Sequence, residues 1–123
     1  MKKLKIAARW LFGAFFIFAG ANHFVNPGFY APLMPPYLPW PDVLNVVSGV
    51  LEIAFGAGLL LPRYRWGSAI GIIALMLAFV PVHVYFIQVG SCIPDSLCVP
   101  PWVGWGRLVV VQPLLMLWAW WVR

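Results

Sequence analysis

Charged side chains are scarce in this sequence, and acidic side chains are the scarcest. Charged residues make up 9% of the 123 residues and include three acids, whereas hydrophobic residues make up 63%. A soluble domain of this size has about a quarter charged residues, so the composition excludes an ordinary water-soluble fold. We therefore expect a membrane protein, and the length of its apolar runs decides how often it crosses the bilayer.

Apolar runs long enough to cross a bilayer occur four times, because a helical span needs about 20 mostly apolar residues. The runs are approximately Ile6–Val25, Val43–Leu61, Trp66–Val89 and Trp102–Val122. They use most of the chain, so the sequence predicts an all-α fold in which residues 1–123 form a single four-helix transmembrane bundle. The first run continues past Ala19-Gly20-Ala21, so we expect a span there and not a cleaved secretory signal.

The basic residues gather at the ends of the expected spans. All eight except Arg107 fall on one side if the spans alternate, while Asp42 and Asp95 fall in the two loops on the other side. The positive-inside rule then places both termini and the Arg63–Arg65 turn in the cytoplasm, in a plasma (inner) membrane. Because these charges sit at span ends, the net charge of +5 indicates contact with anionic membrane lipid and not with nucleic acid.

Proline marks the expected outer loop and one of the spans. The loop between the first two spans, roughly His23 to Pro41, is proline-rich and cannot be a continuous helix. Within it, Asn26 and Pro27 form a cap and first-turn pair that predicts a short interfacial helix. Pro81 predicts a kink near the outer end of the third span, which frees a carbonyl there.

An internal repeat is visible at an offset of 60 residues. Polar and loop residues match at this offset: His23 with His83, Pro41 with Pro101, and Glu52 with Gln112. Each half then contains two spans in the same orientation, related by a two-fold axis along the membrane normal. The alternative is coincidence within an apolar sequence of low diversity.

Glu52 is the one acid inside an expected span. It lies ten residues from Asp42 and ten from Pro62, which is about 15 Å from either end of a helix. A carboxylate at that depth costs several kcal/mol unless it is neutralised, paired or hydrated. Asn45, Ser48 and Glu52 share one helix face, so a polar stripe runs from the outer surface to the acid.

Further polar residues within the spans include His23, His83, Arg107 and Gln112. We expect their faces to converge with that of Glu52, because exposing them all to lipid would cost too much. Arg107 either pairs with Glu52 or extends outward to lipid phosphate or to the acid of the second outer loop. Glu52 itself is either a protonated, hydrogen-bonded tie between helices or a ligand- or proton-binding group. The two histidines have no further donors at metal-site spacing, so no metal site is predicted.

Cys92 and Cys98 lie in the second outer loop, within the string SCIPDSLC. An outside location is oxidising, so the sequence predicts a disulfide that orders this loop. The alternative is a redox-active dithiol, but that chemistry usually relies on two cysteines separated by two residues.

Three strings resemble the DoxX family of small four-helix membrane proteins: AGANHFVNPGFYAPLMPPYLPWP, SGVLEIAFGAGLLLP and RLVVVQPLLMLWAWW. The residues that carry the resemblance are His23-Phe24, Pro27, Tyr30, Met34-Pro35-Pro36, Gly49, Glu52 and Arg107 through Gln112. The resemblance implies four spans and a loose association with redox, thiol or quinone biology. The family takes its name from a membrane subunit of a thiosulfate–quinone oxidoreductase, and the cysteine loop is not part of its pattern.

Two classes of function remain open from the sequence. In the first, the bundle is a binding subunit that holds a quinone or another small amphiphile, in a membrane redox complex or as a homo-oligomer. The candidate ligand-binding residues are His23, Asn45, Ser48, Glu52, His83, Arg107 and Gln112, and the 17% aromatic content supplies apolar walls. In the second class, the protein is a structural subunit or assembly factor whose polar residues only join the helices. No complete catalytic constellation and no haem, flavin or nucleotide motif is apparent.

Overall fold

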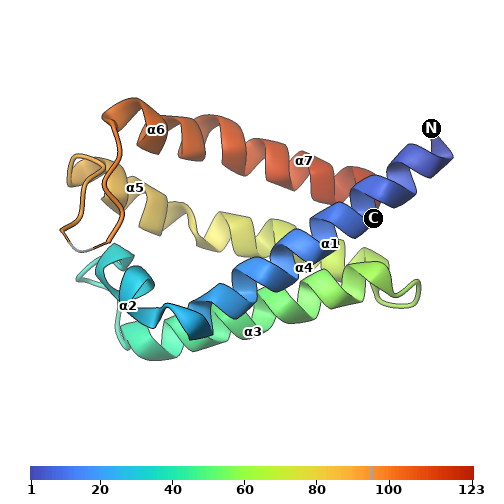
Figure 1. Cartoon of the computed structure of the whole chain (residues 1–123), viewed down its shortest axis with the longest axis horizontal. Coiled ribbons are helices and arrows are strands. Elements are labelled where there is room, and N and C mark those ends of the chain that lie inside the picture. The colour runs from blue at the N-terminus through green and yellow to red at the C-terminus, as the bar shows by residue number, and fades with distance from the viewer. Residues whose placement is uncertain (95) are drawn as a thin grey trace.

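The computed structural model describes residues 1–94 and 96–123, and the regular elements in that part of the chain are helices (Figure 1). Four helical spans within it are long and apolar enough to cross a membrane, which confirms the all-α prediction and the four expected runs. The elements of the spans are α1 (Lys2–Val25), α3 (Pro41–Leu60), α4 (Arg65–Ala78) with α5 (Val80–Gln88), and α6 (Pro101–Gly106) with η2 (Arg107–Val111) and α7 (Gln112–Val122).

The two ends of the bundle differ in what they carry. Both chain termini and the turn of residues 61–64 lie at one end, which we name the terminal end (Figure 1). The opposite end, the capped end, carries α2 (Pro27–Tyr30), the short helix η1 (Ala31–Leu33) and the loop that follows α5. Asp42 lies in the first turn of α3 at the capped end, whereas Asp95 lies outside the described residues.

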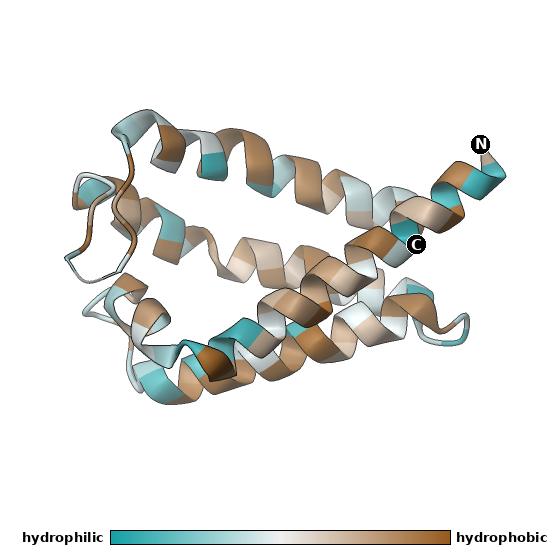
Figure 2. Ribbon diagram, in the orientation of Figure 1, coloured by the Kyte–Doolittle hydropathy of each residue, from teal (hydrophilic) through white to brown (hydrophobic). Residues whose placement is uncertain are grey.

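Large apolar side chains cover the outside of the bundle. Phe18 is 76% exposed and Leu117 is 64% exposed, and apolar residues continue along all the spans (Figure 2). A soluble monomer rarely exposes apolar surface on this scale, so the exterior suits lipid chains and not water. The buried apolar core is built from the following side chains: Phe12, Phe16, Leu59, Ala69, Ile72, Met76, Ala119 and Val122.

Glycines bring α1 and α3 into backbone contact. A Cβ atom on Gly20 would lie 2.6 Å from the carbonyl oxygen of Gly49, and one on Gly13 would lie 2.9 Å from that of Gly56. Neither position can accept a side chain unless the helices separate, because the obstructing atoms are backbone. Small residues allow such close approach between helices in lipid. This contact fixes the relative rotation of α1 and α3.

Prolines interrupt the other two spans. Pro81 has no amide hydrogen, and the helix breaks at Phe79 between α4 and α5, as the sequence predicted. The fourth span contains a feature that the sequence analysis did not predict. Ahead of Pro113, residues Arg107–Val111 form a π-helix, and the amide of Gln112 donates to the carbonyl of Arg107 five residues earlier. Such turns occur frequently at functional sites.

The segments at the capped end are tied to each other. Cys92 and Cys98 form a disulfide with an S–S distance of 2.03 Å, which confirms that prediction. Ser96 Oγ donates to the carbonyl of Phe29 at 2.6 Å, so the second loop is joined to α2. The expected short helix begins after Asn26, but the Asn26 side chain does not cap it. That side chain donates instead to Asn22 Oδ1 at 2.7 Å, a correction to the expected capping role.

Candidate functional site

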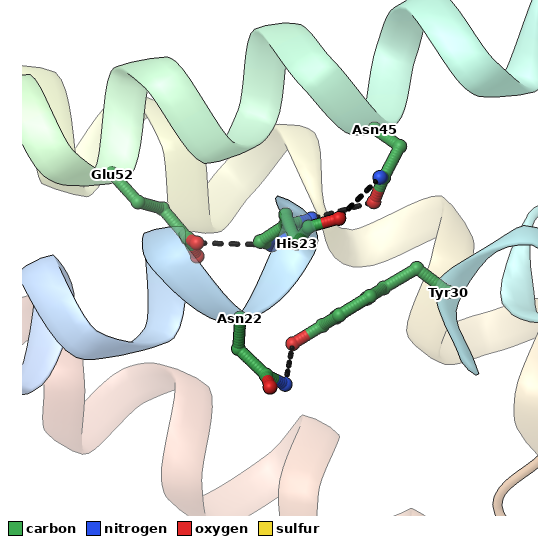
Figure 3. Close-up of polar contacts among 5 residues, drawn as sticks. All are labelled: Asn22, His23, Tyr30, Asn45 and Glu52. Carbon is green, nitrogen blue, oxygen red and sulfur yellow. Dashed lines mark hydrogen bonds and ion pairs between the residues drawn. The ribbon is translucent and has the colours of Figure 1, made fainter. Parts of the chain in front are cut away.

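His23 is the centre of the polar interior. It lies on α1 one turn after Gly20, where the glycine contact brings α3 close, and it is 7% exposed. Its two ring nitrogens face two different side chains of α3 (Figure 3). Nδ1 lies 2.7 Å from Asn45 Oδ1, and Nε2 lies 2.9 Å from Glu52 Oε2. The single imidazole therefore links both ends of the predicted α3 stripe.

Asn45 determines where the hydrogen on His23 lies. The Asn45 amide nitrogen donates to the backbone carbonyl of His23 at 2.9 Å, so the amide oxygen must face the ring. An oxygen can only accept, and Nδ1 therefore carries a hydrogen and donates to it. This arrangement leaves Nε2 as the nitrogen that exchanges its proton with Glu52.

His23 and Glu52 consequently form a pair that is neutral when it holds one exchangeable proton. The proton resides either on Nε2, which gives an imidazolium and a carboxylate, or on Glu52, which gives two neutral groups. Glu52 is 6% exposed, so either form avoids the cost of an isolated buried charge. Apart from this contact, Glu52 Oε2 has no well-aligned hydrogen-bond partner among the described residues. The carboxyl group therefore retains capacity to accept a further hydrogen bond.

Tyr30 of α2 covers the histidine from the capped end. Its ring stacks on the His23 imidazole with 4.0 Å between centroids and 15° between planes. Asn22 Nδ2 donates to the Tyr30 hydroxyl at 2.7 Å and holds the ring in place (Figure 3). Neither residue was predicted to be part of the site. Two features of the sequence could have pointed to them. Asn22 is the neighbour of His23, and Tyr30 closely follows the helix start at Asn26–Pro27.

A cavity of about 470 Å³ lies beside the His23–Glu52 pair. Its walls come from all four spans and from α2 and η1, and most of them are apolar side chains such as Phe16, Leu33 and Phe79. The polar residues that line it are His23, Tyr30, Ser48, Glu52, His83, Arg107 and Gln112. A largely apolar cavity with a few convergent polar groups is the usual form of a small-molecule site.

Comparison with known proteins places the chain in a family. The model of the family described as "Domain of unknown function (DUF8561)" matches residues 12–123, which is most of the chain. The chain belongs to this family. Neither curated proteins nor solved structures give a match. The DUF8561 region includes every residue that lines the cavity, because the lining begins at Phe15 and ends at Leu115.

Six of the seven predicted ligand-binding residues line the cavity of this DUF8561 bundle. The seventh, Asn45, is buried behind His23 and acts on the cavity through it. Gln112 Nε2 donates to the carbonyl of Met76 at 3.0 Å, in the last turn of α4 before the break. His83 is 9% exposed, and its ring forms no hydrogen bond with the described residues.

The direct form of the expected Arg107–Glu52 ion pair is absent from the described residues. Within residues 1–94 and 96–123, the contact at ion-pair distance is His23–Glu52, so the carboxylate is satisfied from α1 and not from the fourth span. Arg107 lines the cavity, and its guanidinium makes no hydrogen bond to the described residues. The cavity of the DUF8561 bundle thus has one cationic group whose charge the His23–Glu52 pair does not balance.

The described residues do not bring three His, Cys, Asp or Glu side chains together, so they offer no ligand set for a metal ion. What the site provides is an exchangeable proton at His23–Glu52, one cation at Arg107 and free hydrogen-bonding capacity at His83. These groups can bind the oxygen atoms of a polar head group while apolar walls hold its tail.

Proposed function

We propose that this protein is a membrane subunit that binds a small amphiphile with an oxygen-bearing head group, for which a quinone is the leading candidate. The observation that carries the proposal is the cavity of about 470 Å³, whose apolar walls surround a small polar cluster. A tail fits against residues such as Phe79 and Leu115, and the head group faces Arg107 and the His23–Glu52 pair. The subunit then serves a membrane redox partner or works as a homo-oligomer.

Hydrogen-bonding capacity supports an oxygen-rich head group. Arg107 and His83 both line the cavity and make no side-chain hydrogen bond to the described residues. A guanidinium presents several N–H donors and no acceptor, so its natural partners are carbonyl or acidic oxygens. Filling the cavity with hydrocarbon alone would leave these donors unsatisfied, at a cost comparable to a lost hydrogen bond for each.

We place the protein in the plasma membrane with both termini in the cytoplasm. The support is the basic bias in the sequence, because the Arg63–Arg65 turn and the Lys-rich N-terminus both belong to the terminal end of the bundle. The proline-rich segment that holds α2 and η1 then faces outward, together with the disulfide loop, and covers the cavity from that side.

We also propose that the chain is a distant relative of the DoxX family and contains a two-fold repeat. The first proposal rests on the sequence strings that resemble that family. The second is supported by the positions of the matched residues, because His23, His83, Glu52 and Gln112 all line one cavity. The two halves have diverged in their contacts. His23 meets Glu52, whereas Gln112 donates to a backbone carbonyl.

One observation favours the second class, a structural subunit or assembly factor. The His23–Asn45 and Gln112–Met76 hydrogen bonds both join neighbouring helices, and such ties stabilise a bundle without any ligand. The cavity distinguishes the two classes, because a purely structural subunit needs no room beside its polar groups.

A binding experiment tests the proposal. Purified protein in detergent is titrated with a short-tailed benzoquinone while its thermal unfolding is followed. Saturable stabilisation of several degrees is expected, since a ligand that binds only the folded state stabilises it by mass action. Arg107→Gln should abolish most of this shift, and Arg63→Gln, which removes a cation outside the cavity, should preserve it. A wild-type protein that shows no saturable shift with the benzoquinone would favour the structural subunit.

A further inference from the structure

A second hollow lies at the terminal end, away from the cavity described above. It has a volume of about 490 Å³. Its lining is Lys2, Lys5, Ile6, Arg9, Trp10 and Arg65, and we name it the basic groove. The groove brings together cations from α1 and from the start of α4, which are far apart in the sequence. Most of these residues precede position 12, where the family match begins.

The two arginines of the groove are held by helix ends. Arg9 Nε donates to the carbonyl of Val122 at 2.7 Å, in the last turn of α7. Arg65 Nε donates to the carbonyl of Leu59 at 3.2 Å, in the last turn of α3. Carbonyls at a helix C-terminus attract cations, so these contacts orient both guanidiniums. Their remaining N–H groups have no hydrogen-bond partner among the described residues.

No acid among the described residues lines the groove to balance its four cations. The described acids, Asp42 and Glu52, lie at the start and in the middle of α3 and not at its terminal end. Like charges held around one hollow repel each other, and this repulsion is relieved when an anion enters between them. The groove therefore has the charge and hydrogen-bonding pattern of a phosphate site.

Apolar side chains in the same lining decide which phosphate compound fits. Ile6 is 44% exposed and Trp10 is 58% exposed, and both belong to the groove. Beyond the polar N-terminal turn of α1, the helix surface becomes apolar (Figure 2). A free phosphate ion would use the cations and leave Ile6 and Trp10 in water, whereas a lipid places its phosphate among the cations and its chains along α1.

We propose that the basic groove is a specific binding site for the head group of an anionic phospholipid. Basic pockets between transmembrane helices bind such head groups on the cytoplasmic side of membranes. The basic groove is separate from the cavity, and lipid binding there does not depend on the ligand of the cavity.

Native mass spectrometry of the detergent-solubilised protein tests the proposal, with phosphatidylglycerol, cardiolipin and phosphatidylcholine as probes. The wild type should retain the anionic lipids in preference to phosphatidylcholine. The double variant Lys2→Gln/Lys5→Gln removes two charges from the groove and keeps Arg9 and Arg65, which are hydrogen-bonded to helix ends. It should weaken the binding of the anionic lipids roughly 30-fold. The matched control, Lys3→Gln/Arg63→Gln, removes two charges from the same end outside the groove, and binding should stay within about twofold of wild type.

Three outcomes would overturn this assignment. Equal weakening by the two double variants would mean that general surface charge attracts the lipid. Equal retention of phosphatidylcholine would remove the need for an anionic head group. Displacement of the lipid by inorganic phosphate at equal concentration would identify a site for a free anion.

Discussion

At the scale of single residues, His23 determines the chemistry of the interior. Its ring is contacted by Asn45 at Nδ1, by Glu52 at Nε2 and by Tyr30 on its face. Asn45 fixes which nitrogen keeps its hydrogen, and Glu52 shares the other proton. Because the pair can move that proton without changing its net charge, the site can adjust to a donor or an acceptor at small electrostatic cost.

The first prediction concerns the coupling within this pair. His23→Gln leaves Glu52 buried without its partner and should lower the free energy of unfolding by about 3–5 kcal/mol. Glu52→Gln removes the acid but keeps its volume and should cost less, about 1–3 kcal/mol. The double variant should lose less than the sum, which denaturation of the detergent-solubilised proteins will measure. Strict additivity would contradict the pairing.

A second double-mutant cycle, which combines Arg107 with Glu52, is the control for the first. Arg107 makes no ion pair with Glu52, so Arg107→Gln and Glu52→Gln should be additive within about 0.5 kcal/mol. A large coupling between these two positions would restore the Arg107–Glu52 pair that the sequence suggested.

At the scale of elements, the contact between α1 and α3 provides the next prediction. Gly20→Ala places a methyl group 2.6 Å from the carbonyl oxygen of Gly49, so the helices must separate. We expect a destabilisation of about 1–3 kcal/mol, as for other overpacked interiors. Gly67→Ala in α4 is the matched control, because nothing lies within 4 Å of its added Cβ. It should be neutral or stabilising by up to about 1 kcal/mol. Thermal unfolding of both variants checks the contrast.

Removal of the disulfide is expected to cause a modest loss of stability. Cys92 and Cys98 are separated by six positions, so the loop-closure model assigns the disulfide about 2 kcal/mol. Cys92→Ser/Cys98→Ser should lower stability by that amount and loosen the contact of Ser96 with Phe29 at the capped end. Hydrogen exchange of α2 amides will report the loosening. Unchanged exchange and unfolding would show that the loop is ordered without the disulfide.

At the scale of the whole molecule, orientation in the membrane is the testable property. Tyr64 is 54% exposed at the terminal end, and Tyr37 is 67% exposed at the capped end. The native cysteines are joined as a disulfide, so an introduced cysteine will be the reactive thiol. An impermeant maleimide should label Tyr37→Cys in sealed cells but reach Tyr64→Cys only after permeabilisation. The reverse pattern would invert the proposed topology.

Much of this molecule could be predicted from composition and spacing. Four spans, the break at Pro81, the disulfide and the burial of Glu52 all depend on local rules of length, proline chemistry and the cost of a charge in lipid. The partner of Glu52 could not be predicted in this way. Whether Glu52 meets His23 or Arg107 depends on how far each helix is rotated about its own axis. The Gly20–Gly49 contact sets the rotation of α1 against α3, and the π-helix ahead of Pro113 sets that of the fourth span.

The contact between α1 and α3 also bears on how the chain is made. Both partners of the His23–Glu52 pair belong to the first two spans, which emerge from the ribosome ahead of α4. The pair can therefore form within a helical hairpin of α1 and α3, in which the imidazole already faces the carboxyl group. The order of the elements along the chain therefore lets the acid meet its partner before the later spans close around it.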